Sequence, residues 1–251
     1  MQHHQQIPGI LKQLRMPGMA ASLDLRLKEA KENNLGHIEF LQLLLQDELI
    51  NRETNLLSKK LKTGGFSNRM TFETFDYRFN EEALNPQTIR DLATCHFVDQ
   101  RRSLVICGPP GIGKSHISQA IGHEVCRRGG DALFMKTQLL LEELTNESYP
   151  RRAARLWKNI KNFDLLVLDD FGFRRYDTKE SEILYSLADF RLGCHSTIIT
   201  SNRPAQDWYG VFPDPVIGGA ILDRLVSGAI KLIVEKAKSY RKSGSEYFPE
   251  S

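Results

Sequence analysis

The chain has 251 residues, 41% of them hydrophobic and 26% charged, with a formal net charge of +3. These values suit a globular protein with one sizeable core and a smaller accessory unit. The sequence excludes a bilayer-spanning segment, because no apolar run approaches the roughly 20 residues that such a segment requires. The small positive charge does not by itself indicate a nucleic-acid partner. Residues 1–10 lack a basic segment followed by an apolar one, so we expect no signal peptide, no membrane partner and a cytoplasmic location.

The four cysteines are too far apart in the sequence to form a CxxC metal or redox motif. We expect Cys95, Cys107, Cys126 and Cys194 to be reduced thiols that are mostly buried. They give no reason to predict a metal site.

Residues 1–65 have the pattern of a small helical module. Apolar residues recur at helical spacing over 19–33 and 38–61, and the second stretch carries a leucine-rich stripe opposite charged and amide side chains. In our interpretation most of these leucines pack the core of the module. The alternative is a surface for a partner protein or a neighbouring protomer. Residues 63–68, which include two glycines, are expected to form a linker.

Over residues 66–251 short apolar runs alternate with helical patterns. Runs of the kind found in buried parallel strands occur near 103–107, 132–135, 165–168 and 196–200. Helices are expected after Pro86, at 115–128, from 139 and at 181–192. The alternation predicts an α/β fold with a mostly parallel sheet flanked by helices.

A phosphate-binding motif, GxxxxGK[ST], lies between the first of these strands and the following helix. Its glycines let backbone N–H groups approach phosphate oxygens, and the helix adds its positive N-terminus. Lys114 is expected to reach the β and γ phosphates, and Ser115 to offer its hydroxyl to Mg²⁺. The residues expected to bind the nucleotide are Gly108, Pro109, Pro110, Gly111, Ile112, Gly113, Lys114, Ser115 and His116.

Two acidic residues end the predicted strand 165–168. Asp169 is expected to hold the Mg²⁺ ion. Asp170 stands where many hydrolytic P-loop enzymes place a glutamate that polarises the attacking water. An aspartate is one methylene shorter, so we expect slow hydrolysis.

Polar residues also end the predicted strand 196–200. Asn202 follows it, and we expect this side chain to lie between the two acidic residues and the γ phosphate, where it orients the water. Along the chain the phosphate loop comes first, then a strand that ends in acids, then a strand that ends in polar residues. This order supports the expected role of Asn202 more strongly than the turn sequence around Asn202 does.

These motifs resemble those of AAA+ ATPases, and more narrowly those of the IstB-like transposition helpers of insertion sequences. The chain is also similar to DnaC-type helicase loaders. The resemblance covers nearly the whole chain, including the N-terminal helical module. The stretches that carry it are DLATC (91–95), GPPGIGKSH (108–116), LLVLDDFG (165–172), TSNRP (200–204), AILDRL (220–225) and SYR (239–241).

The resemblance implies a P-loop AAA+ core with nucleotide sites completed between protomers. Arg224, within AILDRL, matches the arginine that one protomer extends to the γ phosphate bound by the next. Arg241 matches a sensor arginine that contacts phosphate in its own chain. Little sequence follows Arg241, so we expect a reduced or absent C-terminal lid.

The resemblance also implies a helix that contacts the nucleic-acid backbone, inserted here between residues 139 and 163. The stretch 151–161 contains five cations and no acid, and spacings of three and four bring most of the cations together on a helix. Such a face suits phosphate contacts, which give affinity without sequence specificity. The candidate DNA-binding residues are Lys136, Arg151, Arg152, Arg155, Lys158 and Lys161.

The function that the resemblance implies is an ATP-dependent, DNA-binding AAA+ regulator. With ATP and Mg²⁺ as cofactors it would form a homo-oligomer on duplex DNA and assist a transposase. The alternative is a DnaC-like helicase loader that acts on a replicative helicase and single-stranded DNA. The N-terminal helical module favours the first function.

Two further classes stay open. A small-molecule kinase would need an acceptor pocket and an arginine-rich lid, and the two acids at 169–170 argue against it. A switch that binds ATP but never hydrolyses it is suggested by Asp170, which is shorter than the glutamate usual at this position. Preference for adenine rests on the resemblance, and residues 89–93 are expected to border the base.

Overall fold

The structure is a computed structural model that describes residues 2–240, with side chains from residue 6 onward. The chain divides into two compact units, Met1–Lys59 and Lys60–Ser251. Each unit has its own hydrophobic core. In the part of the chain that is described, no helix combines the length and the apolar character needed to cross a membrane.

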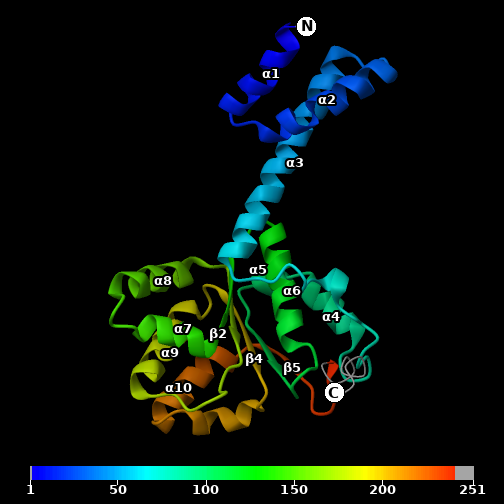
Figure 1. Ribbon diagram of the computed structural model, residues 1–251. Helices are drawn as coiled ribbons and strands as arrows, with labels where there is room; N and C mark the ends of the chain where they lie inside the picture. The colour runs from blue at the N-terminus through cyan, green and yellow to red at the C-terminus, as the bar shows by residue number, and fades with distance from the viewer. Residues whose placement is uncertain (1, 241–251) are drawn as a thin grey trace, which may run out of the picture. The chain divides into compact units, whose positions relative to one another are not determined.

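The N-terminal unit is made of helices, drawn in blue and cyan in Figure 1: α1 (Gln2–Gln13), α2 (Pro17–Glu32) and the first part of α3 (His37–Thr63). Its core includes Leu11, Met19, Leu23 and Leu44. The buried carboxylate of Glu48 on α3 accepts hydrogen bonds from the N–H groups of Gly18 and Met19, at 2.7 and 3.2 Å. These N–H groups open α2 and have no partner within the helix, so Glu48 stabilises the start of α2.

The expectation that most leucines of the long helix pack the core is wrong. Leu44 is buried, whereas Leu41, Leu45, Leu49 and Leu56 each expose between 46% and 59% of their surface. The reason is geometric: the core of this unit takes up one side of α3, and the exposed leucines recur at spacings that place them on another side.

The larger unit contains a five-stranded parallel sheet in the order β2-β3-β4-β1-β5. Its strands are β1 (Leu104–Cys107), β2 (Ala132–Lys136), β3 (Leu165–Asp169), β4 (Ser196–Ser201) and β5 (Ile230–Ile233). The four predicted strands and the α/β fold class are confirmed. The sequence did not predict β5, because this edge strand is short and its residues alternate between partly buried and exposed.

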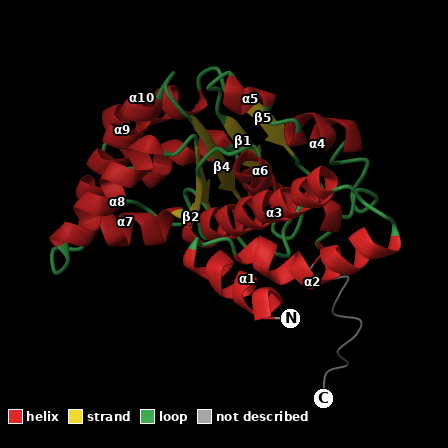
Figure 2. Cartoon of the chain, turned by 90° about the horizontal axis from the view of Figure 1, so that it is seen from above, coloured by secondary structure: helices red, strands yellow, loops and turns green. Residues whose placement is uncertain are grey.

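Helices lie on both sides of the sheet, with α4 and α6 on one side and α9 and α10 on the other (Figure 2). They are α4 (Pro86–Ala93), α5 (His96–Asp99), α6 (Lys114–Arg127), α7 (Thr137–Thr145), α8 (Pro150–Asn162), α9 (Thr178–Arg191) and α10 (Pro215–Val226). Two 3-10 helices, η1 (Phe72–Thr74) and η2 (Ala205–Val211), complete this unit. The four cysteines are free thiols, and three of them are buried as expected, while Cys194 is exposed.

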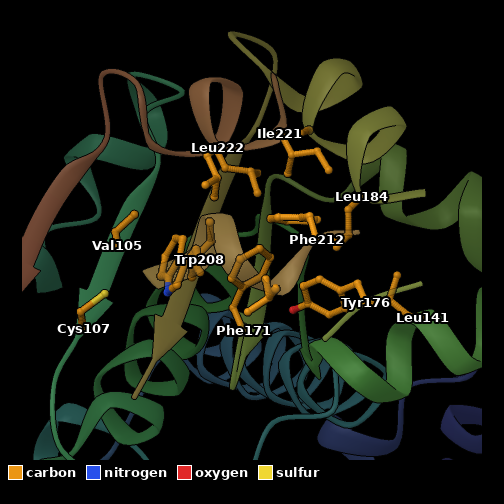
Figure 3. Packing of buried hydrophobic residues seen from close by; sticks show 14 residues of the cluster. Val105, Cys107, Leu141, Phe171, Tyr176, Leu184, Trp208, Phe212, Ile221 and Leu222 are labelled. Atoms are coloured by element: carbon orange, nitrogen blue, oxygen red, sulfur yellow. The ribbon is translucent and has the colours of Figure 1, made fainter. Parts of the chain in front are cut away.

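An aromatic cluster packs beneath the loop that follows β3 (Figure 3). Phe171 lies 4.8 Å from Trp208 between ring centroids, and Tyr176 lies 5.4 Å from Phe212. The indole N–H of Trp208 donates to Ser201 Oγ at 3.2 Å, and the Tyr176 hydroxyl accepts from the N–H of Gly172 at 2.8 Å. Buried aromatic pairs of this kind fix local geometry, so the cluster holds the carboxyl ends of β3 and β4 in place.

Candidate nucleotide site at the carboxyl edge of the sheet

The phosphate loop joins β1 to α6 at the carboxyl edge of the sheet. Gly111 has φ +84° and Gly113 has φ +102°, a region that L residues rarely adopt. A Cβ added at Gly111 would lie 2.1 Å from Ser239 Oγ, so no side chain fits there. Gly113 is the N-cap of α6, which begins at Lys114, and the positive end of the helix therefore faces the loop.

Lys114 and Asn202 meet above this loop. The Lys114 ammonium donates to the carbonyl oxygens of Gly108 and Pro109, at 2.8 and 2.9 Å, and to Asn202 Oδ1 at 2.7 Å. The lysine is only 6% exposed. Both side chains line the same cavity, so the ammonium is held at the tip of β4 by charge-assisted hydrogen bonds.

Asp169 is the centre of a buried hydroxyl network. Ser115 Oγ donates to its two carboxylate oxygens at 2.9 and 3.1 Å, and Thr200 Oγ1 donates at 2.5 Å. Burial raises the pKa of Asp169, and the hydrogen bonds from Thr200 and Ser115 oppose that shift. Thr200 was not predicted as a site residue. The sequence shows only a polar residue at the end of a predicted strand, and its contact with Asp169 arises when β3 and β4 pair.

Asp170 and Lys136 form an ion pair at the same edge. Lys136 Nζ lies 3.4 Å from Asp170 Oδ2, and Lys136 is the last residue of β2. Asp170 has φ +55°, and its N–H donates to Thr200 Oγ1 at 3.2 Å. Aspartate tolerates this backbone region better than most residues. Lys136, expected among the DNA contacts, therefore lies beside the candidate catalytic acid.

A cavity of about 580 Å³ connects these groups. It lies within the usual size range of small-molecule sites, about 300–1,000 Å³. The acids and the phosphate loop form part of its lining, and a second, mostly apolar wall includes Met70, Phe75, Phe79 and Tyr240. His116 supports this second wall, since its Nε2 lies 2.9 Å from the carbonyl oxygen of Thr71. Residues 89–93, expected near the base, are not among the described residues that line the cavity.

The donor set fits a magnesium ion. The described residues contain no group of three or more His, Cys, Asp or Glu side chains that could hold a metal alone. Mg²⁺ does not need one, because it is usually bound through one or two carboxylates together with substrate phosphates and water. The hydroxyl of Ser115 and the carboxylate of Asp169 converge beside the phosphate loop and match that requirement.

Arg224 lies on α10 and is not among the residues that line the cavity of its own chain. Its Nε donates to Asp189 Oδ1 at 2.8 Å, and its guanidinium lies 4.6 Å from the ring centroid of Tyr185. Arg241, the second expected arginine, lies outside the described residues.

Helix α8 carries the five cations between 151 and 161. Arg151, Arg155 and Lys158 are exposed, and at 100° per residue they lie on one side of the helix. Arg152 points elsewhere and pairs with Glu143 on α7 at 2.6 Å. Lys161 is half-buried, with its ammonium 4.5 Å from the ring centroid of Phe190. The basic face therefore consists of three of the expected residues.

Fold and site together define a P-loop α/β nucleotide-binding core. A model of the family described as "IstB-like ATP binding protein" matches residues 9–246, and the chain belongs to that family. A putative ATP-binding protein in an insertion sequence of Mycobacterium tuberculosis is 37% identical over 232 residues, 92% of each chain. The IS21 putative ATP-binding protein of Pseudomonas aeruginosa is 30% identical, over 92% of this chain and 87% of its own.

Solved structures share the fold at lower identity. The DnaC helicase loader superposes with a TM-score of 0.57 at 21% identity, covering 67% of this chain and 99% of its own. AMPPCP-bound DnaA from Aquifex aeolicus has a TM-score of 0.56 at 20% identity, covering 73% of this chain and 56% of its own. These likenesses confirm the α/β fold that the sequence predicted.

Proposed function

We propose that the chain is an ATPase that regulates DNA transposition. It binds ATP and Mg²⁺ in the cavity at the carboxyl edge of the sheet, assembles with copies of itself on duplex DNA, and assists a transposase. Slow hydrolysis of ATP dismantles the assembly. The observation that carries the proposal is the convergence of Lys114, Ser115, Asp169 and Asn202 on one cavity, with each polar group already oriented.

The roles of the side chains follow from their positions. Lys114 neutralises the β and γ phosphates, and Ser115 and Asp169 hold Mg²⁺. Asp170 polarises the attacking water and Asn202 orients it. Bound Mg²⁺ would supply additional charge neutralisation at the phosphates. Asp170 is one methylene shorter than the glutamate common at this position, which supports slow basal hydrolysis.

Assembly brings Arg224 to the nucleotide of a neighbouring protomer. Supporting this, Arg224 lies against Asp189 and Tyr185 on α9 and is not among the residues that line the cavity of its own chain. To reach a neighbour it has to leave Asp189, an ion pair with a largely exposed carboxylate. It also has to leave the ring and hydroxyl of Tyr185 on α9, so assembly exchanges these contacts for the phosphate of the neighbour.

The basic face of α8 contacts the phosphates of duplex DNA. Exposed arginines and lysines without a fixed hydrogen-bond pattern favour contacts to the backbone over reading of bases. The transposase is suggested by the relatives, whose names place them in insertion sequences. A DnaC-like helicase loader remains the second candidate, favoured by the likeness of fold to DnaC.

Sedimentation with and without ATP and a random-sequence duplex tests this proposal, with Lys114→Ala as the control. We expect large complexes only when both ATP and duplex are present, and small species for the control under all conditions. A wild-type protein that stays monomeric with every nucleotide and ignores duplex DNA would contradict it. Assembly that requires single-stranded DNA and a helicase would favour the loader.

A further inference from the structure

Two segments far apart in the sequence meet beside the phosphate loop. One is the stretch 70–80 ahead of β1, and the other is the stretch 234–240 after β5. They are fastened by the side chain of Asn80. Its Nδ2 donates to the carbonyl oxygen of Lys238 at 2.8 Å, and its Oδ1 accepts from the N–H of Lys238 at 2.9 Å. A single side chain thus makes the reciprocal pair of hydrogen bonds that a neighbouring strand would make.

Asn80 is itself held in place by its backbone. It has φ +61°, and its carbonyl oxygen accepts from the N–H groups of Ala83 and Leu84 at 2.9 and 2.7 Å. Asparagine is one of the few residues that adopt this conformation at low cost. The turn therefore presents the amide toward the C-terminal segment.

The fastened segment rests directly on the phosphate loop. The N–H of Tyr240 donates to the carbonyl oxygen of Gly111 at 2.9 Å, and Ser239 occupies the space that a side chain at Gly111 would need. The ring of Tyr240 then meets the ring of Phe79 edge to face, with centroids 4.9 Å apart and planes at 87°. Both rings line the same cavity as the phosphate loop.

The wall made by these two rings suits a flat, largely apolar group. Aromatic side chains bind bases by stacking and edge contacts, whatever the hydrogen-bond pattern of the base. A nucleotide whose phosphates lie on Gly111–Lys114 would extend its base away from Asp169 and toward these rings. Asn80 does not line the cavity, so it acts through the placement of Tyr240.

We propose that Asn80 is a positioning residue that fastens the C-terminal segment over the phosphate loop, so that Tyr240 and Phe79 form the wall that binds the base of a purine nucleotide. The inference rests on the proposed ATP site and adds where the base lies and what places its wall. The base is then bordered by Phe79 and Tyr240 and not, as the sequence led us to expect, by residues 89–93.

The test compares binding of ATP with binding of inorganic tripolyphosphate, which lacks base and sugar, in the full chain with Mg²⁺. Asn80→Gly removes the amide and keeps the left-handed backbone accessible. Asn34→Gly is the matched control, because Asn34 has φ +52° and lies in the other unit. Thermal unfolding of each variant reports its stability.

For Asn80→Gly we expect ATP binding to weaken about tenfold, which is the loss of affinity that follows removal of one or two hydrogen bonds. Binding of tripolyphosphate should be unchanged. Tyr240→Ala should weaken ATP binding by a similar factor through loss of stacking. The control should leave both ligands unaffected. Asn80→Asp places a carboxylate oxygen against the carbonyl oxygen of Lys238, so it should also weaken ATP binding, and it covers the case in which Asn80→Gly fails to fold.

Equal weakening of ATP and tripolyphosphate by Asn80→Gly would mean that Asn80 only maintains the phosphate loop, and would overturn the inference. Unchanged ATP binding in both Asn80 variants would overturn it as well. A wild-type protein that binds neither ligand would instead refute the proposed ATP site itself, so the two failures are distinguishable.

Discussion

The nucleotide cavity and helix α8 are both rich in polar side chains, but the fold holds these side chains in different ways. In the cavity, Lys114 and Asp169 are buried and each makes several hydrogen bonds at 2.5–3.1 Å. On α8, Arg151, Arg155 and Lys158 are exposed to solvent. Chemistry in the cavity depends on fixed distances, whereas α8 offers charge at an approximate position. Single substitutions should therefore have large effects in the cavity and small, additive, salt-dependent effects on α8.

The largest effect is expected for Asp169→Asn. The amide cannot supply the negative charge that Mg²⁺ requires, and it disturbs the hydroxyls of Ser115 and Thr200. We expect hydrolysis of ATP to fall about 10³-fold, at the upper end of the loss that follows removal of one preorganised electrostatic group. Phosphate release measures it.

Asp164→Asn is the matched control for this substitution. Asp164 stands at the opposite end of β3, where it accepts from the N–H of Asp131 at 2.8 Å. Equal losses in the two variants would show that the strand, and not the site, is damaged, and would contradict the role given to Asp169.

A smaller effect is expected for Asp170→Asn. Asparagine keeps the tolerance for φ +55° and removes the charge that polarises water. The hydrolysis rate should fall about 10²-fold, the usual lower range for loss of a general base, while ATP affinity stays the same. Single-turnover measurements with a parallel binding titration separate the two quantities. A full hydrolysis rate in this variant would remove Asp170 from the mechanism.

The smallest single effects are expected on α8. Arg151→Gln and Arg155→Gln should each weaken duplex binding several-fold and reduce the slope of log K against log[salt] by about one. Titrations of DNA binding at several salt concentrations measure both. Arg152→Gln is the control on the same helix, because its partner Glu143 already neutralises it. A control that weakens binding as much as the other two would contradict a DNA contact on this face.

The same contrast explains what the sequence could predict. The phosphate loop could be recognised in the sequence because the backbone geometry at Gly111 and Gly113 leaves few alternatives to glycine. Strands β1 to β4 could be predicted because buried parallel strands are continuous apolar runs in the sequence. The edge strand β5 is partly exposed and lacks that pattern, so it was missed.

Contacts between distant segments that lie outside the motifs could not be predicted. Asn80 and Lys238 are 158 residues apart, and neither belongs to a motif. Thr200 and Lys136 acquire their neighbours Asp169 and Asp170 only when β2, β3 and β4 pair in register. Likewise, helical periodicity located the leucines of α3 on the helix, but could not show how much of their surface the small unit covers.

Phosphate release from ATP tests the central claim most directly. It should be measured with Mg²⁺, in the presence and absence of random-sequence duplex DNA, for wild type and Lys114→Ala. We expect slow phosphate release by the wild-type protein, faster release when DNA is present, and no release by the variant. Tight ATP binding with no release under any condition would contradict it and would identify the chain as a nucleotide-binding switch that does not hydrolyse.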